Sequence, residues 1–165
     1  MFFNVPAECS NHSYLEDAHR GMGFYGYYGY HRCDNYLPSG WYRFRGAAGT
    51  EMPTSCVGTH RCGTYAPGWL NGPHPSVADG AVYATVCFHW SSRCCRWSRS
   101  IRVRNCSGFY VYELGRTPTC NLRYCGNGGG EEEKKNKTDA ETGKLVKTVK
   151  NRDLTKTYFI KKKIF

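Results

Sequence analysis

Residues 81–88 read AVYATVCF and set the fold class of this chain. In an extended chain alternate side chains point to the same face, so one face carries four apolar residues: Val82, Ala84, Val86 and Phe88. A period of two over eight residues favours a β-strand over a helix. We therefore expect this strand to pack one face into the core.

Two neighbouring stretches show the same character. Ile101 and Val103 alternate with arginines, and the turn residues 105–108 (NCSG) lead from them into residues 109–112 (FYVY), which predicts a hairpin. Residues 41–44 (WYRF), after the turn residues 38–40 (PSG), predict a further short strand. The sequence indicates a small, disulfide-rich, mainly β domain with short strands and irregular loops.

The cysteines give that domain its second constraint. None of the ten belongs to a C-x-x-C pair, and an even count at this density is typical of bridges formed in the secretory pathway. We expect disulfides at Cys9, Cys33, Cys56, Cys62, Cys87, Cys94, Cys95, Cys106, Cys120 and Cys125. The pairing stays open, although neighbours such as Cys94 and Cys95 point apart and suit bridges to two different segments.

A zinc site in an intracellular module is a weaker alternative. Cys56 and Cys62 with His60 between them, or His89 near Cys94, could supply ligands, but their spacing is not that of zinc knuckles. We therefore predict no metal and no cofactor.

Charge divides the chain into two regions. Residues 1–125 contain 12 Arg, no Lys and 7 acids, whereas residues 126–165 contain 10 Lys, 1 Arg and 6 acids. We assign residues 7–126 to the cysteine-rich domain and residues 127–165 to a Gly-rich linker with a flexible, basic, Lys-rich tail. A capping-box pattern at residues 138–141 (TDAE) would favour a short helix over residues 141–150, although Gly143 and two valines oppose it.

The net charge of +10 does not by itself indicate a nucleic-acid-binding protein, because the sequence has no recognised binding motif. Residues 1–6 (MFFNVP) have neither the basic nor the apolar region of a signal peptide. Because the cysteines predict a secreted or extracellular protein, we expect the chain to be a fragment of a larger modular precursor. No stretch reaches the roughly 20 apolar residues of a membrane helix.

Residues 21–30 are rich in Gly and Tyr and formally contain the G-x-G-x-x-G pattern of dinucleotide sites. That match is accidental, since no apolar strand precedes it and no helix pattern follows. A flexible aromatic loop is the plain interpretation. Together with the cationic tail, it also leaves a structural matrix or adhesive protein as an alternative function.

Residues suited to catalysis are few. The cysteine-rich domain has seven acids and no nucleophile-elbow pattern, and its six histidines are scattered through loop-like sequence. We predict that the chain is not an enzyme and has no catalytic residues.

Three Asn-x-Ser/Thr sequons are acceptors for N-glycosylation in a secreted protein: Asn11, Asn105 and Asn136. We favour Asn11. Asn105 is a weaker candidate because a cysteine occupies the middle position of its sequon.

Several motifs occur in one order that resembles the uromodulin-type cysteine-rich (ten-cysteine) domain. They include residues 33–35 (CDN), 40–49 (GWYRFRGAAG), 52–56 (MPTSC), 62–72 (CGTYAPGWLNG) and 110–114 (YVYEL), and the pattern ends at Tyr124-Cys125. Within it, six aromatic residues have the character of packing anchors: Trp41, Tyr42, Phe44, Trp69, Tyr110 and Tyr112. The resemblance covers about residues 7–126.

This resemblance implies a disulfide-bonded domain of an extracellular glycoprotein, with roles in adhesion and pathogen capture and no catalysis. In the family, the residues after Trp-Leu commonly form a sequon whose glycan can attract bacterial lectins. Here that site reads Asn71-Gly72-Pro73, which is not an acceptor. We therefore expect a non-catalytic recognition or adhesion module for an extracellular protein or glycan, with Asn11 or Asn105 as its remaining acceptors.

Overall fold

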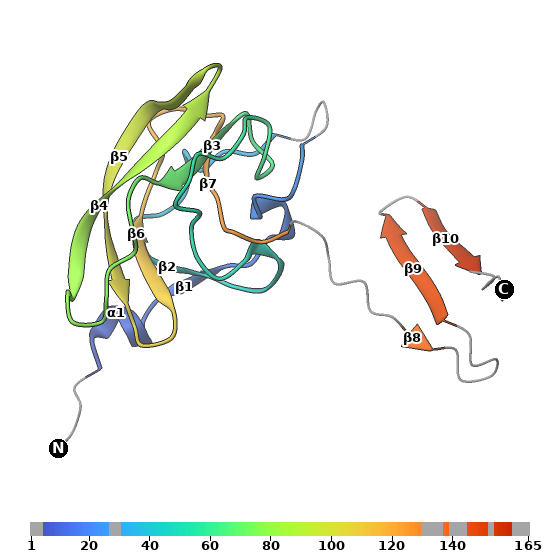
Figure 1. Cartoon of the computed structure of the whole chain (residues 1–165), viewed down its shortest axis with the longest axis horizontal. Helices are drawn as coiled ribbons and strands as arrows, with labels where there is room; N and C mark the ends of the chain where they lie inside the picture. Colours follow the sequence, from blue (N-terminus) through green and yellow to red (C-terminus); the bar gives the residue numbers. More distant parts are fainter. Residues whose placement is uncertain (1–4, 27–30, 130–136, 139–144, 152–153, 160–165) are drawn as a thin grey trace, which may run out of the picture. The chain divides into compact units, whose positions relative to one another are not determined.

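The computed structural model describes residues 5–26, 31–129, 137–138, 145–151 and 154–159 (Figure 1). The chain divides into two compact units, Met1–Glu131 and Glu132–Phe165. Among the described residues, the first unit holds a seven-stranded sheet and the second a three-stranded one.

The sheet of the first unit has the strand order β1-β2-β6-β5-β4-β3-β7. Its strands are β1 (Ser13–Leu15), β2 (Gly40–Phe44), β3 (Ala66–Leu70), β4 (Ala81–Trp90), β5 (Arg93–Asn105), β6 (Tyr110–Leu114) and β7 (Leu122–Tyr124). The short edge strands β1 and β7 pair in parallel with β2 and β3, and the other pairs are antiparallel. Three short helical segments accompany the sheet: α1 (Ala7–Ser10) and the 3₁₀ turns η1 (Ala18–Arg20) and η2 (Gly46–Ala48).

The alternating stretch at residues 81–88 lies in β4, which forms a long twisted hairpin with β5 (Figure 1). Val86 and Phe88 are buried in the main core, whereas Tyr83 on the opposite face is 81% exposed. The predicted hairpin of residues 101–112 is confirmed by the pairing of β5 with β6. The predicted strand at residues 41–44 is confirmed by β2, and the mainly β class by the sheet as a whole.

The main core packs against one face of the sheet and contains most of the predicted aromatic anchors. Tyr42, Phe44 and Tyr112 are buried there, and the ring of Phe44 meets that of Tyr112 edge to face at 5.6 Å. Tyr110 is half-buried against the same core. Trp41 is also half-buried, with the Arg102 guanidinium 5.4 Å from its ring.

The Gly/Tyr-rich segment is partly docked, which corrects the interpretation of residues 21–30 as a flexible loop throughout. The Met22 N–H donates to the Gly126 carbonyl at 2.8 Å, and the Gly26 N–H donates to the His60 carbonyl at 2.9 Å. Each bond joins the segment to a distant part of the first unit, so residues 21–26 belong to the fold. Residues 27–30 lie outside the described residues.

The hydrogen bonds of the first unit continue past residue 126, where the cysteine-rich domain was predicted to end. The Asn127 N–H donates to the Glu51 carbonyl at 2.8 Å, and the Asn127 side chain accepts from the Thr50 N–H at 2.9 Å. The Gly128 N–H donates to the Ala48 carbonyl at 3.1 Å. The Gly-rich stretch therefore begins as part of the module rather than as a free linker.

The described part of the second unit is an antiparallel sheet in the order β10-β9-β8, formed by β8 (Lys137–Thr138), β9 (Leu145–Asn151) and β10 (Leu154–Phe159). The helix considered for residues 141–150 was wrong, because β9 occupies most of that range. β-branched residues at 146, 148 and 149 favour a strand, and a helix of ten residues is marginal in water. The flexibility of the tail stays a prediction.

Across the described residues, none of the helices has the length and apolar character required to cross a bilayer.

Candidate functional site

Five disulfides join all ten cysteines and define the frame on which any site is built. They are Cys9–Cys106, Cys33–Cys120, Cys56–Cys94, Cys62–Cys125 and Cys87–Cys95. Four of them link residues at least 38 positions apart in the chain. Such links restrict the unfolded chain, and each stabilises a fold by about 2–4 kcal/mol.

Two of these bridges hold the tip of the β4–β5 hairpin. Cys94 bonds to Cys56 in the loop before β3, and its neighbour Cys95 bonds back to Cys87 on β4. The expectation that adjacent cysteines reach two different segments is thereby confirmed. The tip is tied both to the other strand of its own hairpin and to a loop distant in sequence.

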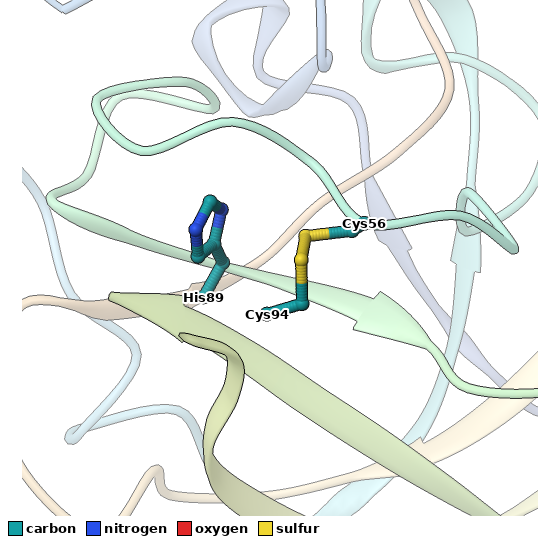
Figure 2. Close-up of side chains that lie close together, drawn as sticks. All are labelled: Cys56, His89 and Cys94. Atoms are coloured by element: carbon teal, nitrogen blue, oxygen red, sulfur yellow. A yellow bond between two sulfur atoms is a disulfide. The ribbon is translucent and has the colours of Figure 1, made fainter. Parts of the chain in front are cut away.

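The zinc alternative can be examined directly, because three of its residues meet. Cys56, His89 and Cys94 lie together, but the two sulfur atoms are joined to each other (Figure 2). A disulfide has no thiolate, the form of cysteine that binds zinc. The His89 ring faces two carbonyl oxygens instead, with Nδ1 2.8 Å from Val57 O and Nε2 3.0 Å from Ser91 O. This cluster is therefore a structural link between the loop and the hairpin tip.

A second, smaller core cluster lies at this end of the sheet and contains the remaining predicted anchor, Trp69. Val57, Trp69 and Cys87 are buried there with the Cys62–Cys125 disulfide. The indole Nε1 of Trp69 donates to the Cys94 carbonyl at 2.8 Å, so the buried polar atom of the ring is satisfied. Trp69 thus connects β3 to the start of β5.

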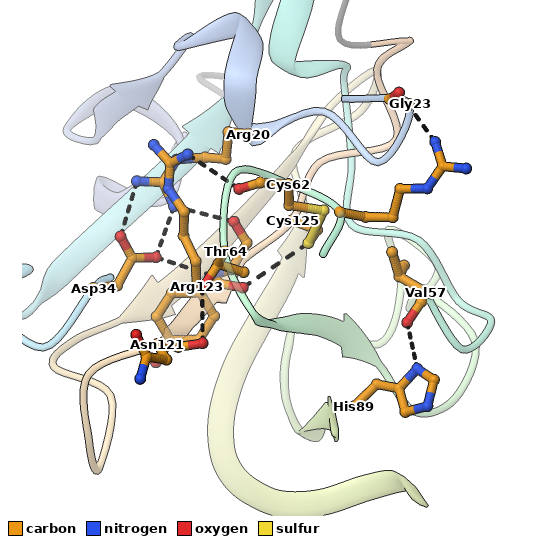
Figure 3. The surroundings of a disulfide bond; sticks show 12 residues. Arg20, Gly23, Asp34, Val57, Cys62, Thr64, His89, Asn121, Arg123 and Cys125 are labelled. Atoms are coloured by element: carbon orange, nitrogen blue, oxygen red, sulfur yellow. Dashed lines mark hydrogen bonds and ion pairs between the residues drawn. A yellow bond between two sulfur atoms is a disulfide. The ribbon is translucent and has the colours of Figure 1, made fainter. Parts of the chain in front are cut away.

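A buried ion pair ties the N-terminal segment to β7, close to the Cys62–Cys125 disulfide (Figure 3). Arg20 donates to both carboxylate oxygens of Asp34, at 2.6 and 2.9 Å, and also to the Tyr124 carbonyl at 3.0 Å. Asp34 in turn accepts the Tyr124 backbone N–H at 2.9 Å. Two-pronged pairing of this kind satisfies the carboxylate almost completely inside the protein.

Arg123 on β7 forms a second such link. Its guanidinium donates to Asp17 at 2.8 Å and to the Cys62 carbonyl at 3.1 Å. Burial alone would raise the pKa of Asp17, but the Arg123 charge and the hydrogen bonds from Arg123 and His19 hold that pKa well below its ordinary value. Asp17 therefore stays ionised, and both pairs act in holding the fold together.

Five rings form what we call the aromatic surface: Tyr25, His31, His60, Tyr65 and Trp90. The Tyr65 ring stacks on His31 with centroids 3.4 Å apart, and it meets His60 at 5.3 Å and Trp90 at 6.0 Å. Burial, and then the charge of His60, lower the pKa of His31. Tyr25 and Trp90 remain 49% and 38% exposed, so this surface offers apolar area to a partner.

The two predicted glycan acceptors within the first unit differ in accessibility. Asn11 is exposed and follows directly after α1. Asn105 is half-buried, its Nδ2 donates to the Pro75 carbonyl at 3.2 Å, and its Oδ1 accepts the Ser107 N–H at 3.0 Å. The middle residue of its sequon, Cys106, is held in the bridge to Cys9. Asn136 lies outside the described residues.

The ion pair Arg20–Asp34 and the aromatic surface had not been predicted. The aromatic surface joins residues from four separate stretches of sequence, and nothing in their local patterns connects them. Asp34 does stand next to Cys33 in the first motif of the family resemblance, but a single sequence does not show what it binds.

Taken together, a single β-sheet with every cysteine in a bridge is the structure of a disulfide-bonded domain of the secreted or extracellular class. A family model that describes a uromodulin-like domain matches residues 42–126. The chain belongs to this uromodulin-like family, which confirms the resemblance seen in its motifs.

Individual relatives of the chain support the same family assignment. The chain is 45% identical over 121 residues to the pancreatic secretory granule membrane major glycoprotein GP2 of Rattus norvegicus, an alignment that covers 71% of this chain and 22% of that protein. It is 48% identical over 113 residues to uromodulin of Mus musculus, covering 68% of this chain and 16% of that protein. The chain thus spans about a fifth of the length of these relatives.

Proposed function

We propose that the chain is a non-catalytic recognition module of a secreted or cell-surface glycoprotein, and that it presents an N-linked glycan on Asn11 to extracellular glycan-binding proteins. The exposure of Asn11 beside the Cys9–Cys106 bridge carries this proposal. Cys9 is two residues from Asn11, so the glycan would be anchored to the hairpin turn at Cys106. A rigid attachment point reduces the entropy lost when a partner binds.

Asn11 would then supply the glycan that the family commonly carries after Trp69-Leu70, where this chain has no acceptor. Asn105 is less suited, because a glycan on its amide would displace the contacts that its side chain makes with Pro75 and Ser107 in the folded module. An adhesive role based on the Gly/Tyr-rich segment is not proposed, since residues 21–26 form backbone hydrogen bonds within the module.

The pairing of the acids supports a module without catalysis. Five of the seven carboxylates of residues 1–129 form ion pairs with arginine: Glu8, Glu16, Asp17, Asp34 and Glu113. Of the other two, Asp79 accepts hydrogen bonds from Ser76 within its own turn, and Glu51 is half-buried. Acid–base catalysis commonly needs carboxylates or histidines that converge on a cleft.

The test is expression of the full chain in mammalian cells with Asn136→Gln in every variant, so that the sequon of the tail carries no glycan. Intact mass is measured before and after treatment with peptide N-glycosidase F. We expect a glycan that Asn11→Gln removes and that Asn105→Gln leaves in place. A mannose-binding lectin such as concanavalin A should retain the secreted protein and lose it with Asn11→Gln. An unglycosylated Asn11 in the secreted protein, or unchanged lectin binding by Asn11→Gln, would overturn the proposal.

A further inference from the structure

The tip of the β4–β5 hairpin borders a hollow of about 240 Å³. Its walls are formed by two tryptophans and the segment that enters β7, with lining residues Ala66, Trp90, Trp97, Thr119, Cys120, Asn121 and Leu122. The volume is below the range of about 300–1,000 Å³ typical of sites for drug-sized ligands. The hollow therefore suits one small ring or a single sugar unit.

The chemistry of the walls fits a sugar. Trp90 and Trp97 offer flat apolar faces for the C–H face of a pyranose ring. Thr119 and Asn121 add a hydroxyl and an amide, which can both donate to and accept from sugar hydroxyls. A mixture of apolar faces and a few polar groups is the usual composition of a specific small-ligand site.

The frame around the hollow is rigid. Cys120 on its wall is bonded to Cys33, and the hairpin tip is held by the bridges of Cys94 and Cys95. Ser91 at the tip has a φ of 54°, which is uncommon for a residue other than glycine, and Asn121 has a φ of 72°, which asparagine adopts more readily. Backbone strain of this kind is found at ligand sites, where it helps to hold a binding geometry in advance.

Three arginines stand close in sequence to wall residues of the hollow: Arg93, Arg96 and Arg116. Across residues 5–26 and 31–129, five of the seven carboxylates pair with other arginines, and no ion pair involves Arg93, Arg96 or Arg116. These three side chains are exposed. Arg93 pairs with Trp90 across the tip, and the Arg96 guanidinium lies 5.9 Å from the Trp97 ring. Arg116 precedes the wall residue Thr119 by three positions.

We propose that this hollow binds an acidic sugar, with the pyranose ring against Trp90 and Trp97 and its carboxylate or sulfate group paired with the surrounding arginines. Guanidinium groups match the planar geometry of a carboxylate and the oxygen pairs of a sulfate. A surface with uncompensated positive charge also raises the local concentration of anionic ligands. The binding is separate from the glycan proposed on Asn11, which lies on another segment.

The experiment uses the secreted full chain, freed of its own N-glycans, and three probes with a common core: 3′-sialyllactose, lactose 3′-sulfate and lactose. Affinity is measured by isothermal titration calorimetry, and tryptophan fluorescence reports contact with the indoles. We expect both acidic probes to bind at least about tenfold more tightly than lactose, because only the acidic probes can form charge-assisted hydrogen bonds with the arginines. The ratio of the two acidic probes distinguishes carboxylate from sulfate as the preferred group.

Two variants and a matched control locate the site. Trp90→Ala should abolish detectable binding, and Arg93→Ser/Arg96→Ser should weaken it about tenfold. Arg43→Ser/Arg45→Ser removes the same charge from β2 and the residue after it, away from the hollow, and should change affinity less than twofold. The Lys-rich tail is identical in all of these proteins. Near-ultraviolet circular dichroism confirms that each variant is folded.

Absence of saturable binding to either acidic probe would overturn the proposal, as would equal binding of lactose. An equal loss of affinity in the Arg43→Ser/Arg45→Ser control would show that the acidic probes respond to the overall positive charge rather than to this hollow. That result would also overturn the proposal. Asn11→Gln should leave sugar binding unchanged, so the loss of the Asn11 glycan and the failure of this site can be told apart.

Discussion

Asp34 connects the buried Arg20 side chain to the backbone of β7. It accepts two hydrogen bonds from Arg20 and one from the backbone of Tyr124, and both partners of the ion pair are almost completely buried. Replacing a buried ion pair by apolar residues can be neutral, but removal of one member leaves the other charge without compensation. The pair is therefore sensitive to single substitutions whatever its net contribution to stability.

We predict that Asp34→Asn lowers the free energy of unfolding by about 3–5 kcal/mol, because Arg20 keeps its buried charge without a counter-charge. The measurement is urea unfolding with the disulfides intact. Glu16→Gln is the matched control, since Glu16 pairs with Arg45 on the exposed surface at 2.6 Å and such pairs contribute less than about 1 kcal/mol. Equal losses in the two variants would contradict this account.

His74 makes stability depend on pH. The Tyr112 hydroxyl accepts the Met52 N–H at 3.0 Å and lies 2.7 Å from His74 Nε2, so its own proton is directed to a neutral imidazole. Burial lowers the pKa of His74, and the charge of Glu51 opposes that only in part. The neutral ring is thus the form that the folded state favours.

Because the pKa of His74 is lower in the folded chain than the value of about 6.5 in an unfolded one, the unfolded chain binds more protons just below that pH. We predict that the free energy of unfolding is unaffected by this group at neutral pH and falls as pH decreases from about 6.5 toward 5. His74→Gln should reduce that fall, measured by urea unfolding at pH 7, 6 and 5. Part of the fall should persist in His74→Gln, because the pKa of His31 is also lowered in the folded chain. An identical pH profile in His74→Gln would exclude His74 as the titrating group.

Strand β3 is closely packed on both of its edges. It lies between β4 and β7 with every residue buried, and it contains Gly68. A Cβ atom at Gly68 would be 2.6 Å from the ring of Phe88 and 3.1 Å from the Arg123 carbonyl. Both neighbours belong to packed strands, so neither can easily move aside.

We predict that Gly68→Ala lowers the free energy of unfolding by about 1–3 kcal/mol through overpacking. Gly40→Ala in β2 is its control, because the nearest atom to a Cβ there is a Tyr42 ring carbon at 3.9 Å. The control should be neutral or stabilising by up to about 1 kcal/mol, since alanine restricts the unfolded chain. Thermal unfolding of both variants would compare them, and a stable Gly68→Ala protein would show that β3 can shift relative to β4.

The molecule as a whole depends on its bridges. Five disulfides at about 2–4 kcal/mol each amount to as much as the entire net stability of an ordinary domain, about 5–15 kcal/mol. The first unit has a main core against its sheet and a second, smaller cluster that contains Trp69 and the bridged cysteines Cys62 and Cys125.

We predict that reduction unfolds the first unit at 37 °C, with loss of its near-ultraviolet circular dichroism signal. Alkylation without reductant should add no mass, because all ten cysteines are bonded. Alkylation after reduction should add ten groups. Alkylation of the native secreted protein would contradict the pairing, and a reduced chain that stays folded would show that the core suffices alone.

Much of the architecture could be predicted from local patterns. The alternation in residues 81–88, the turn at residues 105–108 and the cysteine content predicted β4, the β5–β6 hairpin and the bridged, extracellular class. These features depend on residues within a few positions of one another. Hydrophobic periodicity and turn residues at that range can be recognised directly in the sequence. The helix considered for residues 141–150 was wrong because two local signals disagreed. The capping pattern favoured a helix, but the β-branched residues at 146, 148 and 149 favoured a strand, and the strand formed.

The pairing of cysteines, the partner of Asp34, the docking of residues 21–26 and the hollow beside Trp90 and Trp97 could not be obtained in that way. Each joins segments far apart in sequence, as Cys9 and Cys106 are separated by 97 positions. Local preference carries no information about such contacts, because they arise when the sheet closes and many weak interactions are satisfied together. The sequence alone therefore determined the fold class of the protein. The surface that a partner would contact arose only with the tertiary structure, because it combines residues that are distant in the chain.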